Sequence, residues 1–228
     1  MSKRSKRYKI LLNSTKKDKK IDVKEIMNMV KNNCTTKFDE SIDVSLRINL
    51  KQSKGGDFSL RSVIKLPNGS GKKDKIAVLC EAEKLEDAKK SGADIVGSDD
   101  LLETISSGKF NFTKLICTPG MMGKIGKHGK VLGPKGLMPN PKLGTVSNDV
   151  AKAVKDMKSG LVEVRNDKDG NLASTIGRKS FSSEKLVENY QYFIDSIKKE
   201  KPDTIKGEFI KNIFITSTMG ISYKVGAK

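Results

Sequence analysis

Residue types that serve metal binding and membrane insertion are scarce in this chain. It has one histidine, His128, and three cysteines, Cys34, Cys80 and Cys117, none of which forms a Cys-x-x-Cys pair. Scattered thiols and a single imidazole make a poor zinc site, and they are typical of packed, reduced cysteines in a reducing compartment. Apolar runs such as residues 76–80 are far shorter than the about 20 residues that span a bilayer. We therefore expect no metal ion, no cofactor and no membrane partner.

Acidic residues are few relative to basic ones. The 228 residues include 45 Lys and Arg against 27 Asp and Glu, which gives a net charge of +18 and a pI near 9.7. Such a charge indicates a polyanionic partner. Residues 1–20 hold nine Lys or Arg and one Asp. With so little apolar surface, this tail is predicted to be disordered alone and to order near RNA. No apolar core follows it, so it is not a secretory signal.

Residues 120–144 contain no Asp or Glu at all. This segment holds three of the six prolines, seven of the 20 glycines and five lysines: Lys124, Lys127, Lys130, Lys135 and Lys142. Gly recurs every three residues from 120 to 129, a spacing that lets another backbone approach closely if the segment is helical. The prolines then exclude a long helix or a central strand. The composition fits a rigid basic ribbon along a phosphate backbone, or equally a surface loop of a lysine-rich proteome.

Two hydrophobic patterns divide the chain. Apolar residues alternate with polar ones at 42–50 and 161–165, which is typical of half-buried strands, and residues 166–170 predict a hairpin. A helix is predicted from Ser183, as its cap, to about residue 199, followed by a strand at 209–216. Between these parts, buried strands at 76–80, 94–96 and 114–117 alternate with helices at 81–91, 99–107 and 149–159. That alternation predicts a mostly parallel sheet.

One pattern therefore encloses the other. The predicted fold class combines α+β and α/β: a discontinuous two-layer α+β domain interrupted by an inserted three-layer, Rossmann-like α/β domain. The first domain would comprise residues 1–68 and 160–228, and the second residues 69–159. Two consecutive domains cut near residue 150 are the rival arrangement.

The sequence contains no complete nucleotide-binding motif. Residues 69–73 (GSGKK) lack both the Gly five positions before Gly-Lys and the following Ser or Thr that a P-loop needs. The glycine spacing at 120–129 does not match a dinucleotide-binding turn. Because no nucleophile and base can be paired either, we expect a protein that is not an enzyme. The alternatives are a nucleotide-binding α/β enzyme and a nonspecific basic binder that acts through residues 1–20.

Residues 130–146 (KVLGPKGLMPNPKLGTV) closely resemble the signature of the ribosomal protein L1 family, bacterial or organellar type. Residues 37–41 (KFDES), 165–170 (RNDKDG), 176–178 (IGR) and 216–220 (TSTMG) match the family in order and approximate spacing. The resemblance covers about residues 37–225 and implies the same discontinuous and inserted domains. It implies a monomer within the ribosome, in the bacterial cytoplasm or in a mitochondrion or plastid. It also implies binding to the stalk region of large-subunit rRNA, release of exit-site tRNA and repression of the protein's own mRNA.

The family's main RNA surface lies on the first domain. Carried over residue by residue, it falls on Phe38, Glu40, Ser41, Asp167, Lys168, Arg178, Thr216, Ser217, Thr218, Met219 and Gly220. Short hydroxyls suit phosphate and 2′-OH oxygens, and A-form RNA is read mainly by shape. The lysines of residues 120–144 are implied as secondary contacts to rRNA or tRNA. The chain departs from the family at Gly120, where an Asp is common, and over its first 36 residues.

Overall fold

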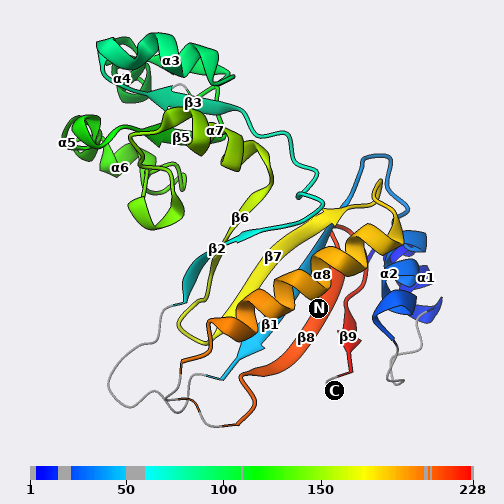
Figure 1. Ribbon diagram of the computed structural model, residues 1–228. Coiled ribbons are helices and arrows are strands. Elements are labelled where there is room, and N and C mark those ends of the chain that lie inside the picture. Colours follow the sequence, from blue (N-terminus) through cyan, green and yellow to red (C-terminus); the bar gives the residue numbers. More distant parts are fainter. Residues whose placement is uncertain are drawn as a thin grey trace. The chain divides into compact units, whose positions relative to one another are not determined.

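The computed structural model describes residues 4–14, 22–49, 60–108, 110–202, 205 and 207–226. Contacts divide the chain into two units, one of Met1–Gly71 with Val162–Lys228 and one of Lys72–Leu161. The cuts inferred from the sequence, before residue 69 and after residue 159, lie close to these divisions. The predicted fold class is confirmed: the first unit is α+β and the second is α/β (Figure 1).

The first unit is built around a four-stranded antiparallel sheet in the order β7-β1-β8-β9. Its strands are β1 (Ser41–Ile48), β7 (Asn171–Arg178), β8 (Ile210–Ser217) and β9 (Tyr223–Val225). A separate pair joins β2 (Arg61–Lys65) to β6 (Leu161–Arg165). The helices among the described residues of this unit are α1 (Lys6–Ser14), α2 (Val23–Asn32) and α8 (Ser183–Lys199).

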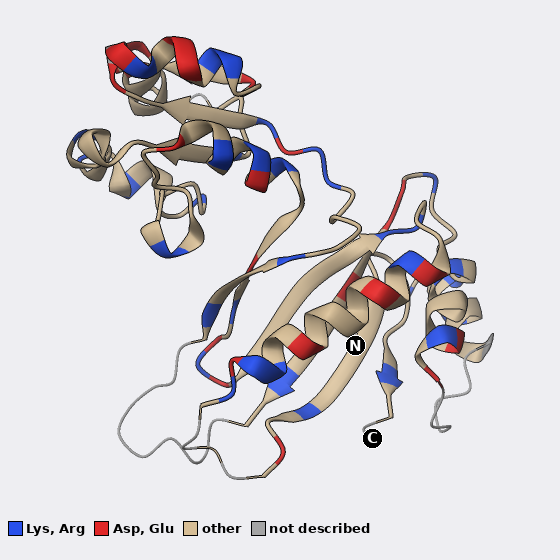
Figure 2. Ribbon diagram, viewed as in Figure 1, with Lys and Arg blue, Asp and Glu red and all other residues tan. Residues whose placement is uncertain are grey.

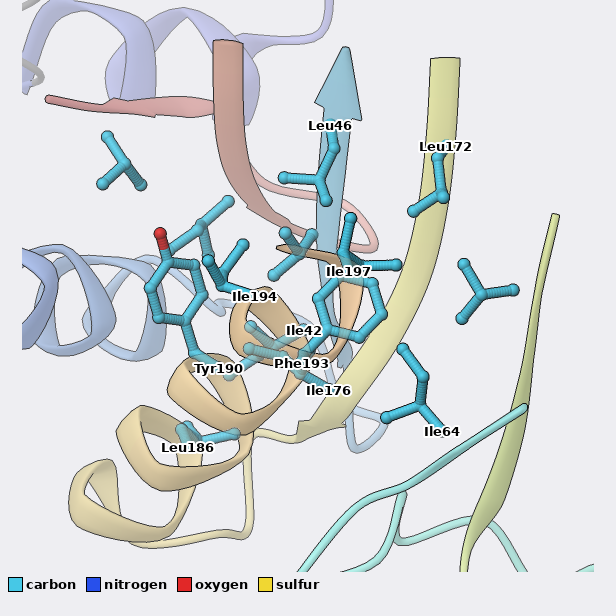
Figure 3. Close-up of a cluster of buried hydrophobic side chains, with 14 of the residues drawn as sticks. Ile42, Leu46, Ile64, Leu172, Ile176, Leu186, Tyr190, Phe193, Ile194 and Ile197 are labelled. Atoms are coloured by element: carbon cyan, nitrogen blue, oxygen red, sulfur yellow. The ribbon is translucent and has the colours of Figure 1, made fainter. Parts of the chain in front are cut away.

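The alternation predicted for the first strand is what builds the core. Ile42, Val44, Leu46 and Ile48 are buried, while the residues between them are partly or fully exposed. Figure 3 shows Ile42 and Leu46 of this set beside the apolar stripe of α8, which includes Phe193. The same core cluster contains the buried apolar residues of α2. Because these helices cover one face of the sheet, the alternate side chains are left on the open face.

The cap of α8 is one residue earlier than predicted. The hydroxyl of Ser182 accepts from the backbone N–H of Lys185, whereas Ser183 is the first helical residue. The hydroxyl of Ser183 instead donates to Asn28 Oδ1 at 2.7 Å. Adjacent serines offer the same cap chemistry, so their tertiary partners decide between them.

Part of the basic tail is helical, which differs from the predicted disorder. Ser5 caps α1 by accepting from the N–H of Tyr8, and Leu11 is only 6% exposed. Arg4 lies over the ring of Tyr8, 5.5 Å from its centroid. A short helix of this composition is marginal alone, so its burial against the unit supplies its stability. Residues 1–3 and 15–20 of the tail lie outside the described residues.

The second unit has three layers. Its parallel sheet has the order β4-β3-β5, from β3 (Ile76–Leu79), β4 (Ile95–Gly97) and β5 (Lys114–Cys117). Its α-helices are α3 (Leu85–Lys90), α4 (Asp99–Ser106), α5 (Met122–Gly126), α6 (Gly129–Leu132) and α7 (Val150–Lys158). Single 3-10 turns occur at η1 (Ala82–Lys84), η2 (Pro119–Met121) and η3 (Pro141–Leu143).

Both faces of this small sheet are covered. Ile76, Val78 and Ile116 pack in one cluster with α3 and α7. Ala77 and Leu79, which point the other way, pack in a second cluster with α4, α5 and α6. The continuous apolar run at residues 76–80 follows from this double burial. The predicted helix at 81–91 is split into η1 and α3, and Gly92 ends it with φ +81°.

Candidate nucleic-acid interface

Residues 216–220 form a turn that is fastened to the start of β1. Thr218 Oγ1 accepts from the backbone N–H of Ser41 at 3.0 Å, and the N–H of Thr218 donates to the Ser41 carbonyl at 3.1 Å. The N–H of Gly220 donates to the Ser217 carbonyl. A Cβ at Gly220 would lie 2.3 Å from Ser217 Oγ, so a larger residue there would force the Ser217 hydroxyl to move. The sequence-predicted residues 216–220 and Ser41 are therefore held together.

Glu40 supports this turn from beneath. Its side chain is fully buried. Its carboxylate accepts from Thr36 Oγ1 at 2.7 Å, from the N–H of Thr36 at 3.3 Å and from the N–H of Met219 at 3.1 Å. Burial alone would raise the pKa of this carboxyl, but hydrogen bonds from Thr36, Met219 and Ser217 outweigh it and lower the pKa. Glu40 is thus an anion that orders two loops and has no surface of its own.

Two apolar side chains stand out at this end of the sheet. Phe38 is 52% exposed and Met219 is 48% exposed. Neither side chain is packed in the core. Arg178 pairs in register with Ser41, and its guanidinium donates to the Asp39 carbonyl at 3.4 Å. The predicted residues at this end of the sheet are Phe38, Glu40, Ser41, Arg178 and residues 216–220. Together they form the Met219 patch, which contains hydroxyls, two exposed apolar groups and one cation.

Asp167 and Lys168 lie elsewhere, on the hairpin between β6 and β7. Asp167 accepts from the N–H of Asn171 at 2.7 Å, from the Asn171 amide at 3.0 Å and from the N–H of Asp169 at 3.0 Å. Hydrogen bonds from Asn171 are the main reason that the pKa of this exposed carboxyl is lowered. Lys168 is exposed to solvent. Here the turn chemistry predicted from the sequence orders the hairpin.

The two groups lie at opposite ends of β1. Ser41 pairs with Arg178 at one end, whereas Ile48 donates to the Gly170 carbonyl of the hairpin at the other. At about 3.3 Å per residue, the ends of this strand are roughly 23 Å apart. The structure therefore does not bring all the predicted residues together. It places them at the two borders of the open sheet face.

Apart from Thr216, sequence reasoning missed the side chains between these borders. In register across three strands, the open face carries the rows Thr175–Asp43–Thr216, Ala173–Ser45–Phe214 and Asn171–Arg47–Asn212. Thr175 Oγ1 donates to Asp43 at 2.6 Å, and Phe214 is 36% exposed. Figure 2 shows few charged residues along β7 and β8. The signal was present in the polar positions of the alternating strand, which mark its outward side.

The acid-free segment of the second unit folds differently from a ribbon. Short helices α5 and α6 bury Ile125 and Leu132 in the core. A Cβ at Gly123, Gly126 or Gly129 would meet nothing within 4 Å, so the predicted close approach of another backbone is wrong at these three positions.

The five lysines of this segment remain at the surface. Two of them have partners within the second unit. Lys124 pairs with Asp99 at 2.7 Å, and Lys135 lies 3.9 Å from the centroid of the Phe110 ring. Lys127, Lys130 and Lys142 are exposed. The Lys124–Asp99 pair is exposed, and exposed ion pairs contribute little energy, so it does not hold Lys124 away from a polyanion.

Other kinds of site find little support. Within the residues that the structure describes, no three His, Cys, Asp or Glu side chains gather in a way that could hold a metal ion. All three cysteines are buried and unpaired with one another. In the same parts of the chain, no helix has the length and apolar character needed to cross a membrane.

Comparison with known proteins decides the family. Residues 30–221 match the Ribosomal protein L1p/L10e family. The chain belongs to the ribosomal protein L1 family. It is 57% identical over 223 residues to large ribosomal subunit protein uL1 of Pelagibacter ubique, and the aligned region covers 97% of this chain and 96% of the relative. The proteins of the same name from Thermosipho melanesiensis and Mycoplasma capricolum are 46% and 45% identical over 226 residues, with at least 97% of each chain covered.

Membership in the L1 family confirms the resemblance carried by residues 130–146. It also confirms that the chain is not an enzyme, because the relatives are ribosomal proteins. The nucleotide-binding alternative is thereby set aside.

Proposed function

We propose that this protein is a constituent of the large ribosomal subunit and grips the stalk region of its rRNA with the first unit. The observation that carries the proposal is the rigid patch at the start of β1. Phe38 and Met219 are exposed there, and buried Glu40 fixes the turn that carries Met219. Exposed apolar side chains in an L1-family protein, held in place by a buried anion, fit a permanent RNA partner.

The chemistry of the open face suits folded RNA. Its middle rows offer hydroxyl, amide and aromatic groups with only Arg47 and Asp43 charged. A-form RNA presents 2′-hydroxyls and sugars in a wide, shallow minor groove, which proteins read mainly by shape. In this proposal the Met219 patch and the Lys168 hairpin contact RNA at the two borders of the face, and Phe214 and Asn212 contact it between them. Glu40 and Ser217 act as positioning residues, because both are buried.

The second unit adds an electrostatic contribution. Its surface lysines at 124, 127, 130, 135 and 142 are proposed as secondary contacts to rRNA or to exit-site tRNA. Repression of the protein's own mRNA follows if that messenger carries a similar RNA fold. Lysine serves such contacts as a point charge that meets phosphate without reading a base.

Affinity for a folded rRNA stalk fragment, set against an unrelated hairpin of equal length over a salt series, tests the proposal. A large preference that persists at high salt is expected, because shape contacts do not release counterions. Equal affinities with a steep salt slope would favour the nonspecific basic binder instead.

Two substitutions test the residues. Thr218→Val removes the acceptor for the Ser41 N–H, and we expect it to weaken stalk binding by about 1 kcal/mol or more. Thr104→Val, on α4 of the second unit, is the matched control and should leave stalk affinity unchanged. Met219→Ala is likewise compared with Met29→Ala, an exposed methionine of α2 in the same unit. Unchanged stalk affinity in both Thr218→Val and Met219→Ala would contradict the assignment of these residues to the RNA interface.

A further inference from the structure

The N-terminal helix contacts the proposed RNA patch directly. Arg7, on the first turn of α1, donates from one guanidinium nitrogen to the Met219 carbonyl at 2.8 Å. Its other terminal nitrogen donates to Thr35 Oγ1 at 3.1 Å. Arg7 and Met219 are 212 residues apart in the sequence. The contact therefore depends on the folded first unit.

The Met219 peptide groups are held from two sides. Glu40 accepts from the N–H of Met219 at 3.1 Å, while Arg7 donates to its carbonyl at 2.8 Å. Both are charge-assisted hydrogen bonds, which are roughly twice as strong as neutral ones. One partner is buried beneath the turn, and the other comes from a helix anchored by the buried side chain of Leu11.

We propose that α1 forms part of the RNA interface, in which Arg7 positions the Met219 turn and the exposed Lys6 and Lys9 meet phosphate. This inference rests on the proposed function. Arg7 is a positioning residue, because its guanidinium is engaged by Met219 and Thr35. Lys6 and Lys9 lie on the same helix, are exposed and have no acidic residue on α1 beside them. Helix α1 is then a shaped extension of the specific site and not a separate, nonspecific arm.

The positioning role is tested by Arg7→Gln against Arg4→Gln. Both changes remove one positive charge from the same segment, but Arg4 contacts the Tyr8 ring and not the turn. We expect Arg7→Gln to reduce affinity for the stalk fragment about tenfold while affinity for the unrelated hairpin changes no more than in Arg4→Gln. Equal effects of the two variants on the stalk preference would overturn the role of Arg7.

A second readout does not involve RNA. Amide hydrogen exchange of Met219 in the free protein should be faster in Arg7→Gln than in Arg4→Gln, because the turn opens more often when its carbonyl loses a partner. Unchanged exchange at Met219 would contradict the positioning role even if RNA binding fell. If the wild-type protein shows no preference for the stalk, the proposed function fails, and exchange alone decides whether Arg7 orders the turn.

The phosphate role is tested by a Lys6→Gln/Lys9→Gln double variant. Each lost phosphate contact lowers the dependence of log affinity on log salt by roughly 0.7 to 0.9. We expect a shallower slope by about one to two units with the stalk fragment. Lys198→Gln/Lys199→Gln, at the end of α8, removes the same charge from the same unit and serves as control. A slope equal to that of this control would exclude α1 from the interface.

Discussion

The buried side chain of Asn189 accepts a hydrogen bond from the backbone N–H of Asn68 at 3.0 Å. Its amide nitrogen donates to the carbonyls of Gly69 and Ile176, at 3.0 and 2.7 Å. One polar residue in the middle of α8 therefore ties the helix to β7 and to residues 68–69. The chain leaves the first unit shortly after this point, since the second unit begins at Lys72.

Asn189→Ala should destabilise the first unit strongly. The substitution leaves the buried carbonyl of Ile176 and the part-buried N–H of Asn68 and carbonyl of Gly69 short of a partner. Losing the partner of a buried group costs about 1–3 kcal/mol. We expect a loss of about 2–4 kcal/mol in the free energy of unfolding, measured by urea denaturation. Gln191→Ala, an exposed position of the same helix, should change stability by less than about 0.5 kcal/mol. Similar effects of the two variants would contradict the anchoring role of Asn189.

Glu40 gives the protein a predictable response to acid. Its pKa is lowered from the ordinary value of 4.5 because hydrogen bonds from Thr36, Met219 and Ser217 outweigh the effect of burial. The unfolded state therefore takes up this proton first as the pH falls. The contribution of Glu40 to stability is complete above about pH 4.5 and declines as the pH falls towards the lower folded pKa.

The free-energy difference between wild type and Glu40→Gln should accordingly shrink below pH 4.5. Urea denaturation between neutral pH and the lowest pH at which the protein stays folded gives this difference. Glu163→Gln is the control, because Glu163 forms an exposed ion pair with Arg61 at 2.9 Å, and such pairs contribute about 0–1 kcal/mol. If the difference between wild type and Glu40→Gln stays constant over this range, that result would falsify the lowered pKa of Glu40.

Local pattern was enough to predict most of the fold. Strict alternation at residues 42–48 marks β1, and the continuous apolar run at 76–80 marks a strand covered on both faces. Each signal depends on side-chain periodicity, which a single sequence displays directly. The hairpin at 166–170 was equally readable, because Asp and Gly set the turn by local hydrogen bonds.

The rest depends on contacts between distant residues. The helix at Lys6–Ser14 is stabilised by burial of Leu11 and by the bonds of Arg7, neither of which leaves a local signal. The family resemblance likewise implies Glu40 as one of several interface residues, whereas burial places it beneath the surface. The separation of the Ser41 and Lys168 groups follows from strand pairing, which periodicity alone does not specify.

The three cysteines should be inert in the native protein. All are buried, and burial raises the pKa of the Cys117 thiol to about 11. Burial is also the main cause of the raised pKa values of Cys34 and Cys80. We expect native protein to react with a thiol-specific disulfide reagent at pH 8 at least about 100-fold more slowly than urea-unfolded protein, because thiolate is the reactive form. A thiol that reacts at the unfolded rate would show that its burial is not maintained.

Two glycines predict opposite outcomes for the same substitution. A Cβ at Gly220 would lie 2.3 Å from Ser217 Oγ, in the turn that carries Met219, whereas a Cβ at Gly123 in α5 would meet nothing within 4 Å. Gly220→Ala forces the buried Ser217 hydroxyl away from its hydrogen bond with Glu40 and should cost about 1–3 kcal/mol of stability. Gly123→Ala should instead stabilise by about 0.5–1 kcal/mol, because alanine restricts the unfolded chain and favours helix. Urea denaturation measures both, and stalk affinity should fall only for Gly220→Ala. A neutral Gly220→Ala would mean that Ser217 can turn aside freely, and the turn would then not be the rigid element on which the proposed interface depends.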